Sequence, residues 1–487
     1  MRLQVIVAEF FYVDYRAEYM LSLEELSSMR IGIIGFGQEG QSVARFLAKQ
    51  NLAATVFDAK TEEELGVEKV REYANQGFVF QVGRAPDNFS QVDVLFRSPG
   101  FPRLSEALVR AEQQGVIITS QTKWFFDYCP CPIVGVTGTK GKGTTVTLIA
   151  RILQQFRDKQ PEASRNILDK IYVTGNIGKL DPLAILPELN SQDVVVFELS
   201  SFQLQDLHRS PHVGVCLMVT QEHLNHHKTV EEYREAKSTI LAYQHKSDIA
   251  VYSDDYIASQ KIGAQGRGKK YMFSRDHAVT NGVYAEGERV FLKEMQVTGS
   301  IDVSKRLLRG AHNLENICAA VAVCATFGVP IQVMEDAVVT FPGLEHRLEF
   351  VGEYGNVKFY NDSMATVPES SIVALQSFLE PKVLILGGSS KGSDFTLLGK
   401  AVASANIRGV ILIGDEAASI DKAITTAGSG SLVLRGATTM EDVFRQIKQI
   451  TKAGDVVLLS PGCASFGMFK SYKDRGEQFK MLAKLFA

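Results

Sequence analysis

Short apolar runs rich in valine and isoleucine alternate along this chain with longer stretches whose apolar residues recur at helical spacing. This alternation is typical of parallel α/β structure, because strands buried on both faces are apolar throughout and are joined by helices. The first series of such runs contains "RIGIIGFGQEG", "AATVFDAK" and "VDVLFRSPG". The pattern therefore predicts a sheet of parallel strands near the start of the chain.

Two further series follow. The second contains "PIVGVTGTKGKGTT", "DVVVFELSSFQ" and "VGVCLMVTQEH", and the third contains "KVLILGGSSKGSDF", "RGVILIGDEA" and "DVVLLSPGCASFGMF". A chain of 487 residues is also too long for one hydrophobic core. We therefore expect three α/β domains, over residues 1–122, 123–343 and 344–487. Their ligands should bind where the carboxyl ends of strands meet the loops.

Composition narrows the function classes. The net charge is −3, so no strong positive field favours nucleic acid or an anionic membrane. No apolar run reaches the length of about 18 residues that a membrane span needs. Residues 1–20 contain Glu9, Asp14 and Glu18, which a signal peptide would not tolerate, and are expected to form an extension or extra strand. Cys129 and Cys131 lack the second close pair of a metal site, so all six cysteines are expected to be reduced, in a cytoplasmic protein.

The first glycine loop, "GFGQEG", has the form G-x-G-x-x-G between a predicted strand and a predicted helix. Asp58 ends the next strand, 18 residues beyond Gly40. Glycines let the backbone approach a diphosphate at a helix N-terminus, and an acidic group can accept hydrogen bonds from ribose hydroxyls. The residues alone leave NAD or FAD, a nucleotide-sugar diphosphate and plain packing as open interpretations.

The second glycine loop, "GVTGTKGKGTT", follows a β-branched strand and precedes a helix. Its backbone N–H groups and Lys142 can bind a polyphosphate. The loop departs from the usual pattern, because Val136 replaces the first glycine and Gly143 replaces the hydroxyl residue after the lysine. Thr144 or Thr145 can supply that hydroxyl to magnesium. We therefore predict that this loop is a nucleotide site rather than a purely structural turn. The site would be formed by Gly138, Thr139, Lys140, Gly141, Lys142, Gly143, Thr144 and Thr145.

Three polar residues strengthen this interpretation. Glu198 ends an apolar strand, His223 follows another, and Lys237 lies in "YREAKSTIL". A carboxylate beside a phosphate loop is a good ligand for a hard cation. Taken singly, each has a plainer explanation as a solvated glutamate, a packed histidine or a surface lysine. Their shared position at strand ends places Glu198 and His223 at one edge of the sheet.

The ordered motifs of the chain resemble those of the Mur ligase family. They are "GVTGTKGKGTT", "TGNIG", "ELSSFQL", "VTQEHL", "YREAK", "GAHNLENICAA", "GLEHRLEF" and "YNDSMAT", and the resemblance covers residues 30–487. It implies an N-terminal Rossmann-like UDP-binding domain, a central P-loop ATPase-like domain and a C-terminal Rossmann-like domain for the amino acid. "LGGSSKGSDF" and "SPGCASFGMFKSYKDRGEQF" resemble the members that add D-glutamate to UDP-N-acetylmuramoyl-L-alanine. The implied reaction passes through an acyl phosphate, uses ATP and two magnesium ions, and belongs to peptidoglycan precursor synthesis.

The resemblance also implies roles for individual residues. The UDP-linked substrate would contact Gly37, Gln38, Glu39, Asp58, Ser98, Pro99, Gly100, Asn176, Ser200 and Gln203. The nucleotide would contact the phosphate loop and Asn313, Asn316, Arg347 and Asp362. The amino acid would contact Thr366, Lys391, Ser465, Phe466 and Tyr472. Magnesium ligands would be Thr144, Glu198, His223 and a carbamylated Lys237, and the catalytic set would be Lys142, Glu198, His223, Lys237 and Arg347.

Four positions depart from the family pattern: Gly143, Asn225, Met364 and Gly467. They leave open L-glutamate as the amino acid, a ligase of the folylpolyglutamate type, and a catalytically inactive family member. The folylpolyglutamate synthases lack a full glycine-loop domain ahead of the ATP domain, whereas residues 30–122 supply one here. We expect a monomer that acts on small molecules.

Overall fold

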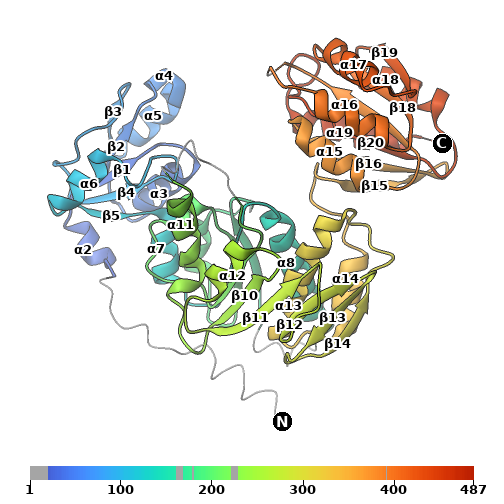
Figure 1. The fold of residues 1–487 in the computed structure, drawn as a ribbon. Coiled ribbons are helices and arrows are strands. Elements are labelled where there is room, and N and C mark those ends of the chain that lie inside the picture. Colours follow the sequence, from blue (N-terminus) through green and yellow to red (C-terminus); the bar gives the residue numbers. More distant parts are fainter. Residues whose placement is uncertain (1–19, 161–167, 178–179, 221–228, 391, 487) are drawn as a thin grey trace. The chain divides into compact units, whose positions relative to one another are not determined.

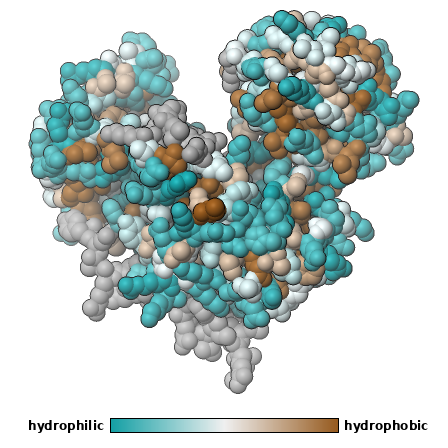
Figure 2. All heavy atoms as spheres, viewed as in Figure 1, coloured by the Kyte–Doolittle hydropathy of each residue, from teal (hydrophilic) through white to brown (hydrophobic). Residues whose placement is uncertain are grey.

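The computed structural model describes residues 20–160, 168–177, 180–220, 229–390 and 392–486. The N-terminal extension expected from the sequence, residues 1–19, lies outside these ranges. The chain forms two compact units, of which one comprises residues up to Ile301 with Glu315–Met334, and the other Asp302–Leu314 with the residues from Glu335 onward. Hydrophilic residues interspersed with small apolar patches cover the face seen in Figure 2. None of the helices within the described ranges is long and apolar enough to cross a membrane.

The first sheet has five parallel strands in the order β3-β2-β1-β4-β5 (Figure 1). The strands are β1 (Ile31–Ile34), β2 (Thr55–Asp58), β3 (Val79–Val82), β4 (Val94–Arg97) and β5 (Ile117–Thr119). The helices are α2 (Leu23–Ser27), α3 (Gln38–Lys49), α4 (Glu62–Leu65), α5 (Val67–Ala74) and α6 (Glu106–Gln113). The strand order reverses between β1 and β4. A doubly wound sheet binds its ligand at such a point, so the loops after β1 and β4 are its candidate site.

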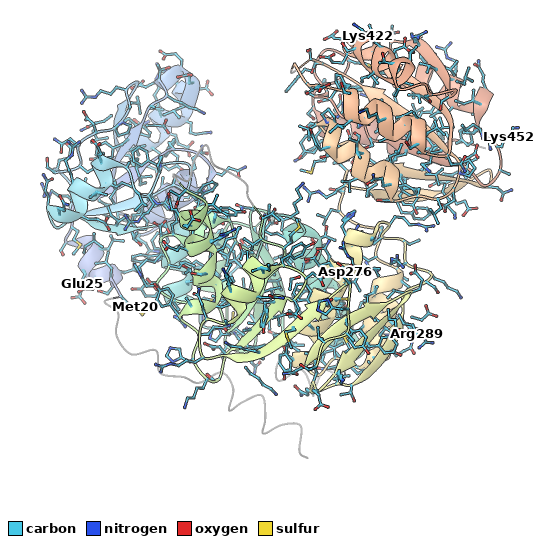
Figure 3. All side chains as sticks on the ribbon, in the orientation of Figure 1. Met20, Glu25, Asp276, Arg289, Lys422 and Lys452 are labelled. Atoms are coloured by element: carbon cyan, nitrogen blue, oxygen red, sulfur yellow. The ribbon has the colours of Figure 1, made fainter. Side chains whose placement is uncertain are left out.

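The second sheet has nine strands in the order β14-β13-β12-β11-β10-β9-β6-β8-β7. They are β6 (Ile133–Thr137), β7 (Ile171–Gly175), β8 (Val194–Glu198), β9 (Val213–Cys216), β10 (Ile249–Ser253), β11 (Lys269–Ser274), β12 (Gly282–Glu286), β13 (Arg289–Lys293) and β14 (Gly299–Asp302). The strands from β7 to β12 pair in parallel, and the strand β6 of the second glycine loop lies between β8 and β9. The antiparallel pair β12–β13, which carries the labelled Arg289 in Figure 3, was not predicted from the sequence.

The helices of this part of the chain include α8, which follows the second glycine loop as the apolar spacing predicted. They are α7 (Gln121–Tyr128), α8 (Lys142–Lys159), α9 (Pro182–Ile185), the short 3-10 helix η2 (Leu186–Glu188), α10 (Ser201–Leu204), α11 (Val230–Ala242), α12 (Ile257–Gly263), α13 (Ala311–Thr326) and α14 (Ile331–Val339). The helix α7 leads from the first sheet to the second and carries three buried aromatic residues.

The first and second sheets share one hydrophobic core. Trp124 of α7 lies 5.8 Å from Phe96 of the first sheet, and Phe126 of α7 lies 5.7 Å from Phe197 of the second, between ring centroids. These side chains belong to one continuous buried cluster. Full burial of such a side chain contributes about 1.5–3 kcal/mol relative to exposure. The glycine loops of the two sheets are therefore held in one packed unit.

The second unit contains a six-stranded sheet in the order β15-β16-β20-β17-β18-β19, parallel except for the antiparallel pair β15–β16. Its strands are β15 (Glu349–Tyr354), β16 (Val357–Asn361), β17 (Lys382–Gly387), β18 (Ile407–Ile413), β19 (Leu432–Ala437) and β20 (Val456–Leu459). Its helices are α15 (Pro368–Gln376), α16 (Thr396–Ser404), α17 (Ala417–Thr426), α18 (Met440–Ile450) and α19 (Tyr472–Lys484). Figure 3 labels Lys422 on α17 and Lys452 just after α18.

Residue spacing explains how this sheet becomes covered on both faces. Along β17, Val383 and Ile385 pack with α18 and α19, whereas Leu384 and Leu386 pack with α15, α16 and α17. This alternation follows from the two-residue period of a strand. The helix α18 packs on its face of the sheet through an apolar stripe of Met440, Val443, Phe444 and Ile447. The result is the three-layered α/β arrangement that the sequence predicted.

Candidate active site

The second glycine loop has a backbone that only glycine can follow. Gly138 has φ 155° and Gly141 has φ 86°. A Cβ atom added to Gly141 would lie 2.2 Å from Asn316 Oδ1, and one added to Gly138 would lie 2.7 Å from the Cβ of Leu217. Gly141 is the N-cap of α8, so the first N–H groups of an 18-residue helix face the loop. Such N–H groups, together with the helix dipole, can bind an anion.

Lys142 folds back over this loop. Its Nζ donates to the carbonyl oxygens of Gly138 at 2.9 Å and Thr139 at 3.1 Å. The Thr139 hydroxyl in turn accepts the N–H of Thr220 at 3.0 Å, which ties the loop to the segment after β9. Lys140 is exposed at the tip of the loop. The ammonium of Lys142 therefore lies beside the backbone that would receive phosphate oxygens.

The hydroxyl residues lie one position later than in the usual pattern. Gly143, Thr144 and Thr145 are all buried in the first turn of α8. Thr145 donates its hydroxyl to Asn316 Oδ1 at 3.3 Å. Asn313 lies one turn before Asn316 on α13, and both asparagines are buried. The predicted nucleotide residues Asn316 and Thr145 are thus in direct contact.

Glu198 is the last residue of β8 and is 9% exposed. In the sheet it pairs with Val136 of β6 and with Gly175 of β7. The chain beyond it is fixed to the strand of the loop, because the Thr137 hydroxyl donates to the Leu199 carbonyl at 2.9 Å. The carboxylate therefore starts from a strand directly beside the phosphate loop, as expected for a ligand of a hard cation.

Lys237 is buried against the same loop and is only 1% exposed, so it is not a surface lysine. Its Nζ donates to the Gly138 carbonyl at 3.0 Å and to the Thr137 hydroxyl at 3.3 Å. Lys142 and Lys237, from α8 and α11, thus donate to one carbonyl oxygen. The structure brings the two predicted lysines together at the base of the loop.

The predicted metal ligand His223 and the departure Asn225 lie outside the described residues. Within the described ranges, no three His, Cys, Asp or Glu side chains are grouped as a metal site would require. The oxygen donors at this edge are Glu198 and the threonine hydroxyls. This donor set suits magnesium, which prefers oxygen ligands and keeps several waters.

The first glycine loop packs as a diphosphate loop does. Gly35 has φ 84°, and a Cβ on Gly40 would lie 1.9 Å from the Gly35 carbonyl oxygen, so helix and strand are in close contact there. A Cβ on Gly37 would meet nothing within 4 Å. There is therefore open space where Gly37 and Gln38 begin α3, at the helix N-terminus that would receive a diphosphate.

Side chains from the neighbouring strands fix this loop. The Ser98 hydroxyl donates to the Gly35 carbonyl at 2.7 Å, and Pro99 and Gly100 form the turn that follows. Asp58 accepts the N–H of Phe36 at 2.6 Å through Oδ2. The carboxylate that the sequence assigned to the substrate thus also shapes the turn.

The predicted substrate residues of the two sheets meet at Glu39. Gln203 donates its amide to Glu39 Oε1 at 2.8 Å, while Glu39 Oε2 is buried without a hydrogen-bond partner in the described structure. Burial raises the pKa of Glu39 to about 7. Gln203 is held in turn by a capping box with Ser200. Asn176 is exposed at the end of β7.

Sequence reasoning missed a buried ion pair that joins the same two segments. Arg97 ends β4, and its Nε and Nη2 donate to the two carboxylate oxygens of Asp206 at 2.9 and 2.7 Å. It also donates to the carbonyls of Phe101 at 2.6 Å and Phe202 at 2.5 Å. The available signal was a charged residue that closes an otherwise apolar strand in "VDVLFRSPG".

Asp181 makes a second link between the sheets that was not predicted. It is the N-cap of α9, and it accepts hydrogen bonds from Ser42 and, at 2.8 Å, from Arg45 of α3. Gln121 of α7 donates to Ser42 at 2.5 Å. The helix that opens at the first glycine loop is therefore anchored to the second sheet.

In the second unit, the predicted nucleotide residue Arg347 lies in a strained loop. His346 and Leu348 on either side have φ 63° and 43°, which non-glycine residues rarely adopt. Asp362 holds this loop by accepting the Leu348 N–H at 3.1 Å, and burial raises the pKa of Asp362 to about 7. Such strain is concentrated at functional sites. Arg347 itself is exposed.

The predicted amino-acid residues lie on two loops and one helix start. Thr366 follows β16, Ser465 and Phe466 follow β20, and Tyr472 is the first residue of α19. Ser465 is buried, whereas Phe466 is 65% exposed, which is unusual for a phenylalanine. Lys391 lies outside the described residues.

Two of the departures from the family pattern also lie in this unit. Met364 contacts Arg347 through a 3.5 Å approach of Nη2 to Sδ. Gly467 has φ 93°, so an acidic residue there would be strained. The positive φ angle therefore explains why this position is a glycine.

Three family models match successive parts of the chain. The Mur ligase MurD-like N-terminal domain matches residues 29–120, the Mur ligase middle domain residues 136–324, and the Mur ligase glutamate ligase domain residues 346–463. The chain belongs to the Mur ligase family. The matched ranges contain the first glycine loop, the phosphate loop and the loop of Arg347, respectively.

Curated relatives in the Mur ligase family cover nearly the whole chain. Two proteins named UDP-N-acetylmuramoylalanine–D-glutamate ligase, from Clostridium tetani and Symbiobacterium thermophilum, are each 35% identical over 93% of this chain and over 96% and 98% of their own length. Among solved structures, UDP-N-acetylmuramate-alanine ligase MurC from Thermotoga maritima matches with a TM-score of 0.54 and 18% identity, covering 94% of this chain and 99% of that one. MurF from Acinetobacter baumannii matches with a TM-score of 0.56 and 16% identity, covering 93% of each chain. The structural matches show the Mur ligase fold.

Proposed function

We propose that this Mur ligase adds D-glutamate to UDP-N-acetylmuramoyl-L-alanine and converts ATP to ADP and phosphate, in peptidoglycan precursor synthesis. Relatives with this name match nearly the entire chain, and a glutamate ligase domain model matches its C-terminal part. One structural observation carries the proposal. A diphosphate-type loop and a triphosphate-type loop lie in one packed unit, and Glu39 of the first loop accepts a hydrogen bond from Gln203 of α10, the helix that follows β8 of the second sheet.

The chemistry explains why a triphosphate site is needed. A carboxylate does not react with an amine in water, so ATP first phosphorylates the terminal alanine carboxylate to give an acyl phosphate and ADP. The glutamate amine then attacks the carbonyl carbon, loses its proton, and phosphate leaves from the tetrahedral intermediate. Because both reactants of the first step are anions, catalysis depends on positioning and charge neutralisation.

The residues of the phosphate loop supply these functions. We assign the N-terminus of α8, with Gly138 to Thr145, to the phosphates of ATP, and Lys142 to the charge that develops on them. Support comes from the left-handed Gly141 and from Lys142 lying over the loop carbonyls. Arg347 is assigned to the transferred phosphate, and Asn313, Asn316 and Asp362 to the nucleotide.

We assign magnesium at two sites to Thr144, Glu198, His223 and a carbamate on Lys237. When bound, magnesium offsets the negative charge of the phosphates and of the carboxylate. Glu198 and Thr144 fit this role because they are oxygen donors at the edge of β8 and in the first turn of α8. A neutral lysine amine adds carbon dioxide and releases a proton, which gives a carbamate, an anionic oxygen ligand. Lys237 suits this because it is buried directly beside the phosphate loop.

The UDP part of the substrate is assigned to the N-terminus of α3 and its surroundings. Gly37 offers open space there, and Gln38 and Glu39 begin the helix. The remaining contacts on this side are Asp58, Ser98, Pro99 and Gly100. Asn176, Ser200 and Gln203 are assigned to the muramoyl part, because Gln203 contacts Glu39.

The amino acid is assigned to Thr366, Lys391, Ser465, Phe466 and Tyr472. The proposal retains three functional domains, residues 1–122 for UDP, 123–343 for ATP and 344–487 for the amino acid. It further places a monomer in the cytoplasm, where ATP and UDP-linked precursors are present.

Phosphate release tests the function directly. The purified protein is mixed with ATP, magnesium, UDP-N-acetylmuramoyl-L-alanine and either glutamate enantiomer. We expect release that requires the UDP substrate and D-glutamate together. Turnover with L-glutamate but not with D-glutamate would change the amino acid assigned. Turnover only with a folate substrate would favour the folylpolyglutamate type. No turnover would favour an inactive family member.

The carbamate has its own test. Protein equilibrated with 13C-labelled bicarbonate should show a carbamate signal by 13C NMR that is lost in Lys237→Arg. Lys269, a surface-strand lysine on β11, provides a control when changed to arginine. A signal that persists in Lys237→Arg would contradict the assignment.

A further inference from the structure

Arg475 is the most deeply buried cation of the second unit within the described ranges. It lies in the first turn of α19 and is 0% exposed. Sequence reasoning gave it no role. A buried guanidinium requires hydrogen-bond partners for its donors, so its contacts show what it holds together.

The guanidinium joins two loops of the sheet to α19. Its Nε donates to the Ser363 hydroxyl at 2.9 Å, and its Nη2 donates to the Ser363 carbonyl at 2.7 Å. Both terminal nitrogens also reach the Cys463 carbonyl at 3.3 Å, and Nη1 reaches the Ala464 carbonyl at 3.4 Å. One side chain thus fixes the loop after β16 and the loop after β20.

These loops carry the residues assigned to the amino acid. Thr366 lies three positions beyond Ser363, and Ser465 and Phe466 follow Ala464 directly. The Ser363 hydroxyl also donates to the Tyr472 carbonyl at 2.8 Å. Every amino-acid residue assigned above within the described ranges therefore lies within three positions of a group that Arg475 or Ser363 binds.

Arg475 also differs electrostatically from Arg97. Arg97 is neutralised by Asp206, whereas in the described part of the chain no carboxylate forms an ion pair with Arg475. Burial lowers the pKa of Arg475 to about 10, although the Asp362 carboxyl acts in the opposite direction. This value is still well above neutral pH, so the guanidinium stays protonated. A positive charge beneath these loops favours an amino acid that carries two carboxylates.

We propose that Arg475 is the positioning residue of the amino-acid site: it sets the loops that bear Thr366, Ser465, Phe466 and Tyr472 without touching the substrate. The inference rests on the proposed function. It adds a specificity device for the acidic amino acid, separate from the residues that bind ATP and the UDP substrate.

The test compares the KM values of the three substrates in Arg475→Lys. Lysine keeps the charge but lacks the planar fork, so it cannot hold both loops at once. We expect the KM for glutamate to rise about tenfold, as the loss of charge-assisted hydrogen bonds predicts. The KM values for ATP and for the UDP substrate should stay within about twofold of the wild type.

Lys382→Met is the matched control. Lys382 is buried at the amino end of β17, whereas the loops that Arg475 binds follow the carboxyl ends of β16 and β20. It donates to the carbonyls of Phe378 at 2.8 Å and Glu380 at 2.9 Å. It should lower the stability of the unit without raising the KM for glutamate. Equal increases of all three KM values in Arg475→Lys, or a glutamate KM raised as much by Lys382→Met, would overturn the proposal.

A second variant, Ser363→Ala, tests the proposal even if Arg475→Lys does not fold. It removes one hydroxyl that links Arg475 to Tyr472, and it should raise the KM for glutamate selectively by about threefold or more. An unchanged value would overturn the proposal. A wild-type protein that turns over no acidic amino acid would reject the proposed function itself, and the inference with it.

Discussion

Thr144 and Thr145 stand side by side in the first turn of α8, yet their surroundings differ. The Thr145 hydroxyl donates to Asn316, whose side chain also lies against Gly141. Thr144 is one position nearer the loop and is assigned to magnesium. We therefore propose that Thr144 compensates for the missing hydroxyl at Gly143, because α8 begins at Lys142 and places Thr144 within its first turn.

Thr144→Ala should therefore lower kcat/KM for ATP by about tenfold to a hundredfold, because a ligand of the nucleotide's cation is lost. Thr147→Ala, one turn further along α8, is the control and should leave kcat/KM near the wild-type value. Steady-state kinetics at varied ATP and magnesium provide the measurement. Intact ATP use in Thr144→Ala would show that another group serves the cation.

The raised pKa of Glu39 should make the stability of the protein depend on pH. Its pKa in the folded protein is about 7, above the ordinary value of 4.5, because burial disfavours the charged form. The folded protein then binds more protons than the unfolded chain between these values, so stability falls as pH rises from about 4.5 to 7. In Glu39→Gln this fall should shrink by about 1 kcal/mol or more. Urea unfolding without substrate at several pH values measures it, and an identical pH profile in the variant would contradict the explanation.

At the scale of elements, the buried pair of Arg97 and Asp206 joins the end of β4 to the segment just after α10. Ser98 directly follows β4 and Gln203 lies in α10, and both are assigned to the UDP substrate. The pair therefore holds together two segments that carry proposed substrate residues.

Arg97→Met should destabilise the protein by about 3 kcal/mol or more, because Asp206 would be left buried without its main partner. The double variant Arg97→Met with Asp206→Leu should recover part of this loss, since no unpaired charge remains. Urea unfolding measures both. A single variant as stable as the wild type would show that the pair does not hold these elements together.

The sequence allowed the repeating strands and helices and the glycine loops to be predicted, because their periodicity and left-handed glycines are local properties. It did not allow the networks of Arg97, Asp181 and Arg475 to be predicted, since a single charged residue looks the same whether it is solvated or buried. Burial of Lys237 depends likewise on how α11 packs on β6 and β9, which no local pattern encodes. The antiparallel strands β12 and β13 were missed because they follow a parallel series without a clear change of pattern.

For the whole molecule, the account depends on ATP activating the substrate carboxylate. Both glycine loops, Glu198, and the two lysines that donate to the Gly138 carbonyl belong to a single packed unit, which suits transfer of phosphate to a carboxylate. This transfer can be traced in the released phosphate, because that phosphate keeps one oxygen atom of the original carboxylate.

UDP-N-acetylmuramoyl-L-alanine labelled with 18O in its alanine carboxylate makes this record visible. The labelled substrate is turned over with ATP, magnesium and D-glutamate, and the phosphate is analysed by mass spectrometry. The account predicts one 18O atom in each phosphate released and ADP as the nucleotide product. Phosphate free of label, or AMP as the nucleotide product, would contradict it.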